Sequence, residues 1–215
     1  MKRIFDFLLA LLGLLMSLPL WFIFALAIWF EDNGEIFYFQ ERVGKDGKIF
    51  KSVKFRSMVS KVEEISGPIQ SHEHDRRVTK LGRILRATAM DELPQLWNIL
   101  KGQMSFVGPR ALRPFEIDGP DNKPKSIKEF EGFDQRCRIR PGLTGTAQIL
   151  APRDISRREK FKYDIWYVNH QSLWLDIKII ILSFFITLMG KWEIRLPRFK
   201  SLTKRLYCRI TKDLP

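Results

Sequence analysis

The feature that most constrains this chain is a run of 24 residues, at positions 7–30, that contains no charged side chain. As an α-helix it would reach roughly 36 Å, which exceeds the ~30 Å hydrocarbon layer of a bilayer. A secretory signal has a shorter apolar core and small residues at its cleavage site, whereas Trp21 and Trp29 crowd that position here. The run therefore predicts a permanent membrane element, with a buried helix of a soluble protein as the alternative.

The topology of this element depends on Pro19, which lies near the middle of the run. Proline removes a backbone donor and clashes with the preceding turn, so it kinks or breaks a helix. Lys2 and Arg3 favour a cytoplasmic N-terminus, and the rest of the chain carries most of the net charge of +13, which favours the same side. A re-entrant helix–break–helix and a kinked helix that spans once both remain open on this evidence.

Composition limits the remainder to one core-bearing domain with small appendages. The chain has 215 residues, of which 45% are hydrophobic and 28% charged, and this balance excludes a disordered or fibrous protein. Its two cysteines, Cys137 and Cys208, form no C-x-x-C motif. We therefore expect neither a disulfide scaffold nor a cysteine-based zinc site.

Residues 36–57 are predicted to form a β-hairpin, because two runs rich in β-forming residues flank the turn Gly44-Lys-Asp-Gly47. Lys54 and Arg56 are two positions apart in the second run, so they share one strand face. They could bind one anion there or form an ordinary solvated face.

Two short helices are predicted after a loop at residues 58–75. Residues 76–86 carry five basic side chains and no acid, and the apolar positions from Leu81 onward recur at helical spacing. The second helix is predicted to begin at Asp91, to hold Pro94 in its first turn and to end before Gly102.

The second half of the chain contains a predicted surface loop, an apolar helix and a basic tail. The loop at residues 118–128 is polar and rich in glycine and proline. Asp176 and Lys178 interrupt the apolar stretch at residues 172–190, which leaves too little to span a bilayer and favours an interfacial or core helix. The tail at residues 191–215 interleaves basic and apolar residues, which indicates a membrane-surface segment, with nucleic-acid binding as the alternative.

The adjacent carboxylates Asp91 and Glu92 are the strongest candidates for chemistry, because a helix start favours an anion. Cations flank them in the sequence or lie in neighbouring segments: Lys54, Arg56, Arg86, Arg110 and Arg140. Arginine forks bind phosphate oxygens, and an ionised aspartate can attack phosphorus or hold Mg²⁺. The pattern therefore suits phosphoryl chemistry, although Asp91 alone would more often be a structural helix cap.

Longer motifs go further than this cluster. Residues 81–110 read Leu81-Gly-Arg-Ile-Leu-Arg-Ala-Thr-Ala-Met-Asp-Glu-Leu-Pro-Gln-Leu-Trp-Asn-Ile-Leu-Lys-Gly-Gln-Met-Ser-Phe-Val-Gly-Pro-Arg110. Other blocks follow in order: Gln40-Glu-Arg-Val-Gly44, Lys54-Phe-Arg-Ser-Met58, Arg140-Pro-Gly-Leu-Thr-Gly145 and Tyr163-Asp-Ile-Trp-Tyr167. From about residue 2 to residue 190 the sequence resembles the bacterial sugar transferases, the monotopic phosphoglycosyl transferases that act on polyprenyl phosphate.

The resemblance implies that a phosphosugar moves from a UDP-sugar to polyprenyl (undecaprenyl) phosphate, giving a polyprenyl diphosphosugar and UMP, with Mg²⁺ as the cofactor. It implies that Asp91 attacks the phosphorus bonded to the sugar and forms a covalent intermediate, that Glu92 assists, and that both carboxylates are metal ligands. We assign substrate or phosphate binding to residues in the matching blocks: Lys54, Arg56, Arg86, Arg110, Arg140 and Asp164.

The resemblance also implies an α+β fold with a membrane-embedded N-terminal re-entrant helix, a small β-hairpin, several short helices and an interfacial amphipathic helix near the C-terminus. The expected domains are a re-entrant membrane helix at 1–30, a cytosolic phosphoglycosyl transferase domain at 31–190 and a basic membrane-surface tail at 191–215. The expected location is the bacterial inner membrane, with the catalytic domain on the cytoplasmic face against anionic lipid. The product would enter a glycoconjugate or exopolysaccharide pathway.

Some positions depart from the family's pattern: Leu18 replaces a frequent serine, Ala111 a usual proline and Thr146 a usual aromatic residue. These departures leave the sugar open, and a homodimer is also left open. Two alternatives remain, a nucleic-acid-binding protein, suggested by a pI near 9.9, and a non-catalytic membrane scaffold. The sequence lacks the motifs of known RNA modules, which opposes the first alternative, and it keeps both Asp91 and Glu92, which opposes the second.

Overall fold

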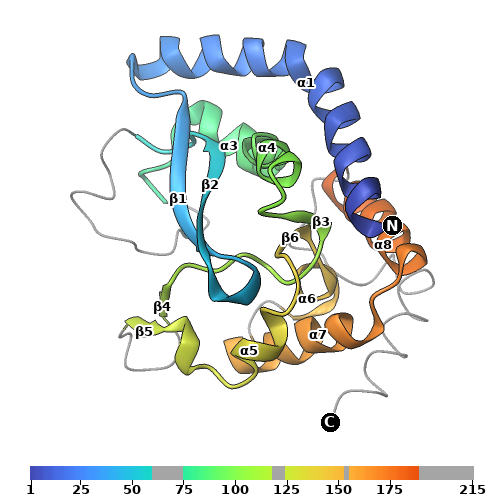
Figure 1. The fold of residues 1–215 in the computed structure, drawn as a ribbon. Coiled ribbons are helices and arrows are strands. Elements are labelled where there is room, and N and C mark those ends of the chain that lie inside the picture. Colours follow the sequence, from blue (N-terminus) through green and yellow to red (C-terminus); the bar gives the residue numbers. More distant parts are fainter. Residues whose placement is uncertain (60–74, 118–123, 153–154, 189–215) are drawn as a thin grey trace.

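The computed structural model describes residues 1–59, 75–117, 124–152 and 155–188 (Figure 1). Its α-helices, in chain order, are α1 (Lys2–Asp32), α3 (Lys80–Ala87), α4 (Gln95–Leu100), α5 (Phe133–Arg136), α6 (Thr146–Leu150), α7 (Arg157–His170) and α8 (Leu173–Leu188). Its strands pair as β1 (Phe37–Val43) with β2 (Ile49–Phe55), β3 (Ser105–Val107) with β6 (Gly142–Thr144), and β4 (Phe115–Ile117) with β5 (Pro124–Ser126). This mixture of helices and strands confirms the predicted α+β class.

The predicted hairpin is confirmed by β1 and β2, which are antiparallel. Tyr38 lies opposite Lys54 and Gln40 lies opposite Ser52. Directly opposed residues of an antiparallel pair lie on the same sheet face. The hairpin therefore has one face that carries a phenol, an amide, a hydroxyl and an ammonium group.

The first predicted helix is confirmed by α3, whose first turn is capped by the Thr79 side chain. The prediction that the second helix begins at Asp91 is wrong. Residues Met90–Glu92 form a separate 3-10 turn, η2, and α4 begins only at Gln95. The cause is local, because the amides of Glu92 and Leu93 bond three residues back and Pro94 has no N–H to continue an α-helical ladder.

The loop predicted at residues 118–128 is corrected in part. Residues 118–123 lie outside the described residues, but 124–126 form β5 and 127–129 form a 3-10 turn, η3. Ile127 is buried with Leu112 and Phe133, and this single apolar anchor orders a segment whose composition is typical of loops. Most of the loop predicted at 58–75 and the whole tail at 191–215 also lie outside the described residues.

The N-terminal element, α1, is an apolar helix with Pro19 inside it, and it bends partway along its length (Figure 1). By length and composition it is the one helix in the described ranges that could cross a membrane. Ala10 packs on α4, and Ile28 packs on Phe55 and Leu85 near the other end. We attribute the bend to Pro19, because proline in a helix interior breaks the hydrogen-bond ladder.

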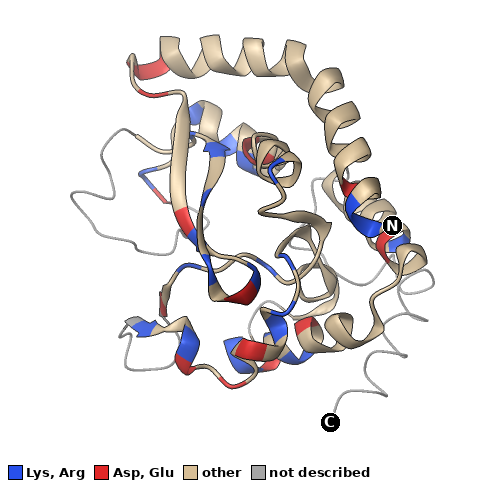
Figure 2. Cartoon of the chain, viewed as in Figure 1, with Lys and Arg blue, Asp and Glu red and all other residues tan. Residues whose placement is uncertain are grey.

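Charged residues of α1 are confined to its two ends (Figure 2). At the start, Lys2 forms an ion pair with Asp176 (Nζ–Oδ2 2.6 Å), and Asp6 accepts hydrogen bonds from Ser105 and from the Phe106 amide. At the end, Asp32 forms an ion pair with Arg56. Both ends of α1 therefore contact the same folded body.

The largest core cluster lies where α7 and α8 cover β3 and α6. Tyr167 and Ile179 are almost fully buried in it. The opposite face of α8 leaves Trp174, Phe184 and Phe185 exposed. The helix predicted at 172–190 is thus present, one of its faces belongs to the core, and its position at a membrane interface stays a prediction.

Candidate active site

Asp91 and Glu92 lie on η2, a tight turn between α3 and α4. Ala89, the residue just before η2, has a positive φ of 55°, which is a strained conformation for a residue other than glycine. Asp91 is 8% exposed. The turn that begins at Ala89 therefore leaves the Asp91 carboxylate buried and the Glu92 carboxylate partly buried beside it.

Lys54 of β2 faces these carboxylates from the polar face of the hairpin. Its Nζ lies 3.8 Å from Asp91 Oδ2 and forms an ion pair and hydrogen bond with Glu92 Oε1. The structure thus brings Lys54 to two adjacent carboxylates that follow it by 37 and 38 positions in the sequence. One cation shared by the buried Asp91 and the partly buried Glu92 reduces the mutual repulsion of the two carboxylates.

The two carboxyl groups differ in acidity. Burial raises the pKa of Asp91 to about 6, and repulsion by Glu92 adds to this effect, while attraction to Lys54, Arg86 and Arg110 opposes it. Burial also raises the pKa of Glu92, but attraction to Lys54 and Arg110 outweighs burial, so this pKa lies below its ordinary value. Glu92 is therefore the more permanent anion, and Asp91 is largely ionised at neutral pH.

A metal ion could be held here by Asp91 and Glu92. Within the described ranges no cluster of three or more acidic, histidine or cysteine side chains could hold a metal by itself. Mg²⁺ is commonly bound by one or two carboxylates together with substrate phosphates and water. The two adjacent carboxylates fit that pattern, and the remaining ligands would come from substrate.

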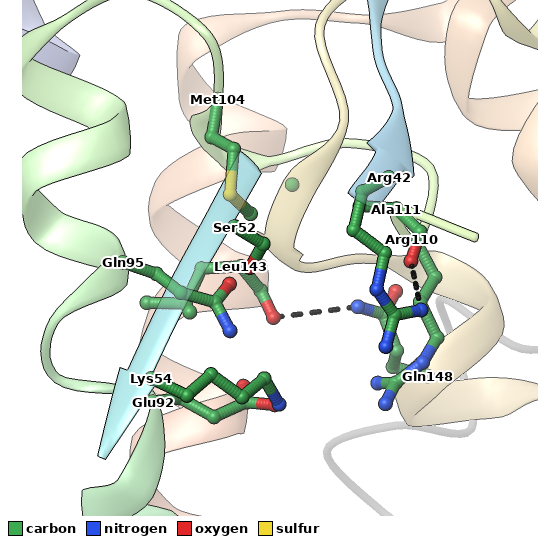
Figure 3. A pocket seen from close by; sticks show the side chains of 11 residues that line it. Arg42, Ser52, Lys54, Glu92, Gln95, Met104, Arg110, Ala111, Leu143 and Gln148 are labelled. Carbon is green, nitrogen blue, oxygen red and sulfur yellow. Dashed lines mark hydrogen bonds and ion pairs between the residues drawn. The ribbon is translucent and has the colours of Figure 1, made fainter. Parts of the chain in front are cut away.

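Beside the carboxylates lies a half-open pocket with two arginine side chains on its far side. In Figure 3, Lys54 and Glu92 lie on one side, and Arg42, Arg110 and Gln148 lie on the other. Arg42 donates to the Ala111 carbonyl (2.8 Å) and to Gln40. The lining residues are Arg42, Ser52, Lys54, Glu92, Gln95, Met104, Arg110, Ala111, Gly142, Leu143 and Gln148.

Positive charge accumulates in this pocket. Burial, together with repulsion by Arg110 and Arg113, lowers the pKa of Arg42 to about 10. Two neighbouring guanidinium groups at such a site are unfavourable without an anion, because like charges repel and burial removes water. Arginine forks match the oxygens of phosphate groups. The arrangement suits an anionic ligand whose phosphates extend from the carboxylates toward Arg42 and Arg110.

Comparison with known proteins is decisive at this point, since the model of the bacterial sugar transferase family matches residues 1–190. The chain belongs to this family. It is 39% identical over 189 residues to the undecaprenyl-phosphate glucose phosphotransferase of Komagataeibacter xylinus, an alignment that covers 85% of this chain and 35% of that protein. It is 38% identical over 195 residues to the UDP-glucose:undecaprenyl-phosphate glucose-1-phosphate transferase of Klebsiella pneumoniae, with 88% and 40% covered.

A relative of similar size is the exopolysaccharide production protein ExoY of Sinorhizobium fredii (strain NBRC 101917 / NGR234). It is 38% identical over 193 residues, which are 83% of this chain and 81% of that protein. The chain therefore covers about four fifths of this ExoY relative but only 35–40% of the other two relatives.

Of the other residues that we assigned to substrate binding, one lies beside the carboxylates and the rest lie outside the pocket lining. Arg86 lies beside the carboxylates and donates from Nε to Ser57 Oγ (2.8 Å). Arg56 forms an ion pair with Asp32 of α1. Arg140 donates to the carbonyl of Gly102 (2.7 Å), after the end of α4. The contacts of Arg56 and Arg140 hold structural elements together, and neither side chain lines the pocket.

Asp164 does not reach the pocket either. It forms a buried ion pair with Arg136 (2.9 Å), and Arg136 also donates to the backbone carbonyl of Arg110 (2.7 Å). Asp164 therefore acts on the pocket only indirectly. It orients Arg136, and Arg136 holds the backbone of Arg110. Its expected direct contact with substrate has no support in this geometry.

Arg42, Ser52 and Gln148 line the pocket but were missed as site residues. The alternation Ser52, Lys54 along one strand was a usable signal, because alternate residues share a face. Arg42 lies within a block that resembles the family, but its proximity to Arg110 depends on a contact between distant segments. No pattern in the sequence distinguished Gln148.

Proposed function

We propose that this protein is a membrane phosphoglycosyl transferase that moves a phosphosugar from a UDP-sugar to undecaprenyl or another polyprenyl phosphate and releases UMP. The observation that carries the proposal is the pair Asp91 and Glu92 beside Lys54, in a pocket that Arg42 and Arg110 also line. The named activities of relatives support the same reaction. The ExoY relative supports a role in exopolysaccharide production.

In the proposed first step, a carboxylate oxygen of Asp91 attacks the phosphorus that bears the sugar. The bond between this phosphorus and the UMP oxygen breaks, UMP leaves with the electron pair, and an acyl phosphate joins the phosphosugar to Asp91. In the second step, an oxygen of the polyprenyl phosphate attacks the same phosphorus and Asp91 leaves as a carboxylate. Lys54 favours the ionised form that both steps require.

Asp91 and Glu92 would hold Mg²⁺ together with substrate phosphates. The bound ion would supply positive charge to the diphosphate. Arg42 and Arg110 would orient the phosphates from the other side of the pocket, so that the reacting phosphorus is directed toward Asp91.

We also propose that α1 enters the membrane and returns to the cytoplasmic face. Contacts of both its ends with one folded body support this path, because the ends of a helix that spans once are separated by ~30 Å of hydrocarbon. The exposed apolar face of α8 and the basic tail at 191–215 would rest on the anionic leaflet of the bacterial inner membrane.

The test is a panel assay on the purified full chain in lipid nanodiscs. Each UDP-sugar is mixed with undecaprenyl phosphate and Mg²⁺, and UMP release is measured. We expect at least one UDP-sugar to give UMP that depends on the lipid and is abolished by EDTA. Absence of UMP with every UDP-sugar, from protein shown to be folded, would contradict the proposed function.

A further inference from the structure

Gln148 on α6 is a buried amide with one unused atom. The residue is 8% exposed, and its Nε2 donates to the carbonyl of Leu143 (3.3 Å). Its Oε1 has no hydrogen-bond partner among the described residues. A buried acceptor that has lost water and gained no partner is unfavourable. Gln148 lines the pocket, so a bound ligand is the candidate source of the missing donor.

The bond to Leu143 fixes which way the amide faces. Nε2 must point toward the Leu143 carbonyl, because that oxygen can only accept. The backbone makes room for Oε1, since a Cβ on Gly145 would lie 2.6 Å from this atom. The position of Oε1 is therefore set by the hydrogen bond of Nε2 to Leu143 and by the absence of a side chain at Gly145.

The position of Gln148 limits the ligand group. The amide lines the pocket on the same side as Arg42 and Arg110 (Figure 3). Two cations select phosphate oxygens, whereas a carbonyl oxygen repels them and requires an N–H or O–H donor. The ligand must therefore present a neutral donor close to a phosphate group.

We propose that Gln148 Oε1 accepts a hydrogen bond from a hydroxyl or N–H group of the UDP-sugar, next to the diphosphate that Arg42 and Arg110 bind. This inference rests on the proposed function. A nucleotide sugar has such donors on its sugar, its ribose and its uracil ring, whereas a polyprenyl chain has none outside its phosphate. Gln148 would thus help the site to distinguish the donor substrate from the lipid acceptor.

The test measures binding by the full chain carrying Asp91→Asn, so that bound nucleotide sugar is not consumed. The probes are UMP and UDP-glucose, or UDP-galactose if the wild-type protein turns over that sugar. Gln148→Met keeps the side-chain length and removes the acceptor. Gln148→Ala is the second variant, because a smaller side chain cannot clash. Gln135→Met, at an exposed position of α5, is the matched control.

We expect both Gln148 variants to weaken UDP-sugar binding on the order of 10-fold, as loss of one hydrogen bond predicts. Unchanged UMP binding would assign the donor to the sugar, and an equal loss for UMP would assign it to the nucleoside. Unchanged binding of both probes, in variants whose unfolding temperature matches the control, would overturn the inference. Failure of the wild-type protein to bind UMP in the presence of Mg²⁺ would instead contradict the proposed function on which the inference rests.

Discussion

Asp91 combines a proposed chemical role with a cost to stability. Burial raises its pKa to about 6, above the ordinary 3.8, so the folded state binds this proton more tightly than the unfolded state does. The stability that comes from this proton is fully present below about pH 3.8 and is lost as the pH rises through about 6. Ionised Asp91 should therefore destabilise the metal-free protein at neutral pH.

Replacement of Asp91 by asparagine should remove that cost. In EDTA at about pH 7.5, Asp91→Asn should raise the free energy of unfolding by about 1–3 kcal/mol, and the difference should shrink toward about pH 4. Thermal unfolding of both proteins across this range measures the effect. A difference that does not change with pH would contradict the assignment of the raised pKa to Asp91.

The same substitution should abolish chemistry. Without lipid acceptor, wild-type protein mixed with UDP-sugar and Mg²⁺ should release at most one UMP per site and gain the mass of a phosphosugar. Asp91→Asn should show neither and should lose on the order of 10³-fold or more in turnover with lipid, because an amide is a poor nucleophile. Intact-protein mass spectrometry checks this, with exposed Asp134→Asn as control.

Turnover with lipid but no mass gain in wild-type protein would favour direct transfer between the two bound substrates. Asp91 would then be only a metal ligand. The phosphosugar mass gain without lipid therefore tests the covalent mechanism separately from the overall reaction.

Site residues were predictable where a motif carried them and unpredictable where a distant partner decided their role. Asp91 and Glu92 were found because adjacent carboxylates among basic residues form a local pattern. Arg56 and Arg140 have the same residue type as Arg110, yet Arg56 pairs with Asp32 and Arg140 donates to the Gly102 carbonyl after the end of α4. Composition cannot distinguish these outcomes, because the contacts join segments far apart in the sequence.

At the scale of single elements, helical periodicity identified α3, and two β-rich runs around a turn identified the hairpin, while the start of α4 was misplaced. Helical spacing from Leu93 onward is real, but it does not report how the backbone enters the helix. The positive φ of Ala89 and the missing N–H of Pro94 together produce a tight turn. The two carboxylates therefore lie on a strained turn, where their direction is set by the backbone.

The bend of α1 can be tested by labelling. In protein whose native cysteines are replaced by serine, one cysteine is placed either just before Lys2 or at Asn33. Both positions should react with a membrane-impermeant maleimide from the same side, because each end of α1 is tied to one body. Pro19→Ala should shift part of the population toward labelling from opposite sides, since alanine favours a continuous helix.

In protein that keeps Pro19, labelling of the cysteine before Lys2 and the cysteine at position 33 from opposite sides would contradict the re-entrant path. Exposed Lys48 replaced by cysteine serves as the marker of the catalytic body, because it lies in the hairpin turn. Its side of reaction identifies the face on which the catalytic body lies, independently of α1.

At the scale of the whole molecule, the first turn of the apolar helix α1 is tied to the folded body that carries the candidate site. Lys2 is the ion-pair partner of Asp176, which is 1% exposed. Lys2→Met would leave that carboxylate with the Tyr167 hydroxyl and no cation. We expect the free energy of unfolding to fall by about 1–3 kcal/mol, less than for a fully buried pair because Lys2 is partly exposed.

Thermal unfolding and UMP release measure this effect, with Lys48→Met as control. Lys2→Arg should retain most of the stability, because the positive charge is kept. Equal stability of Lys2→Met and wild type would show that the ion pair does not hold α1 to the core.

The ion pair between Lys2 and Asp176 joins residues 174 positions apart, and this separation has a consequence for biosynthesis. At roughly 5–20 residues per second, Asp176 leaves the ribosome about ten to thirty seconds after Lys2. On the proposed membrane path, α1 would therefore take its orientation before Asp176 has been synthesised. Two steps would thus follow one another during translation. Lipid and flanking charges would first determine the path of α1, and the ion pair with Asp176 would then hold α1 in place once α8 is complete.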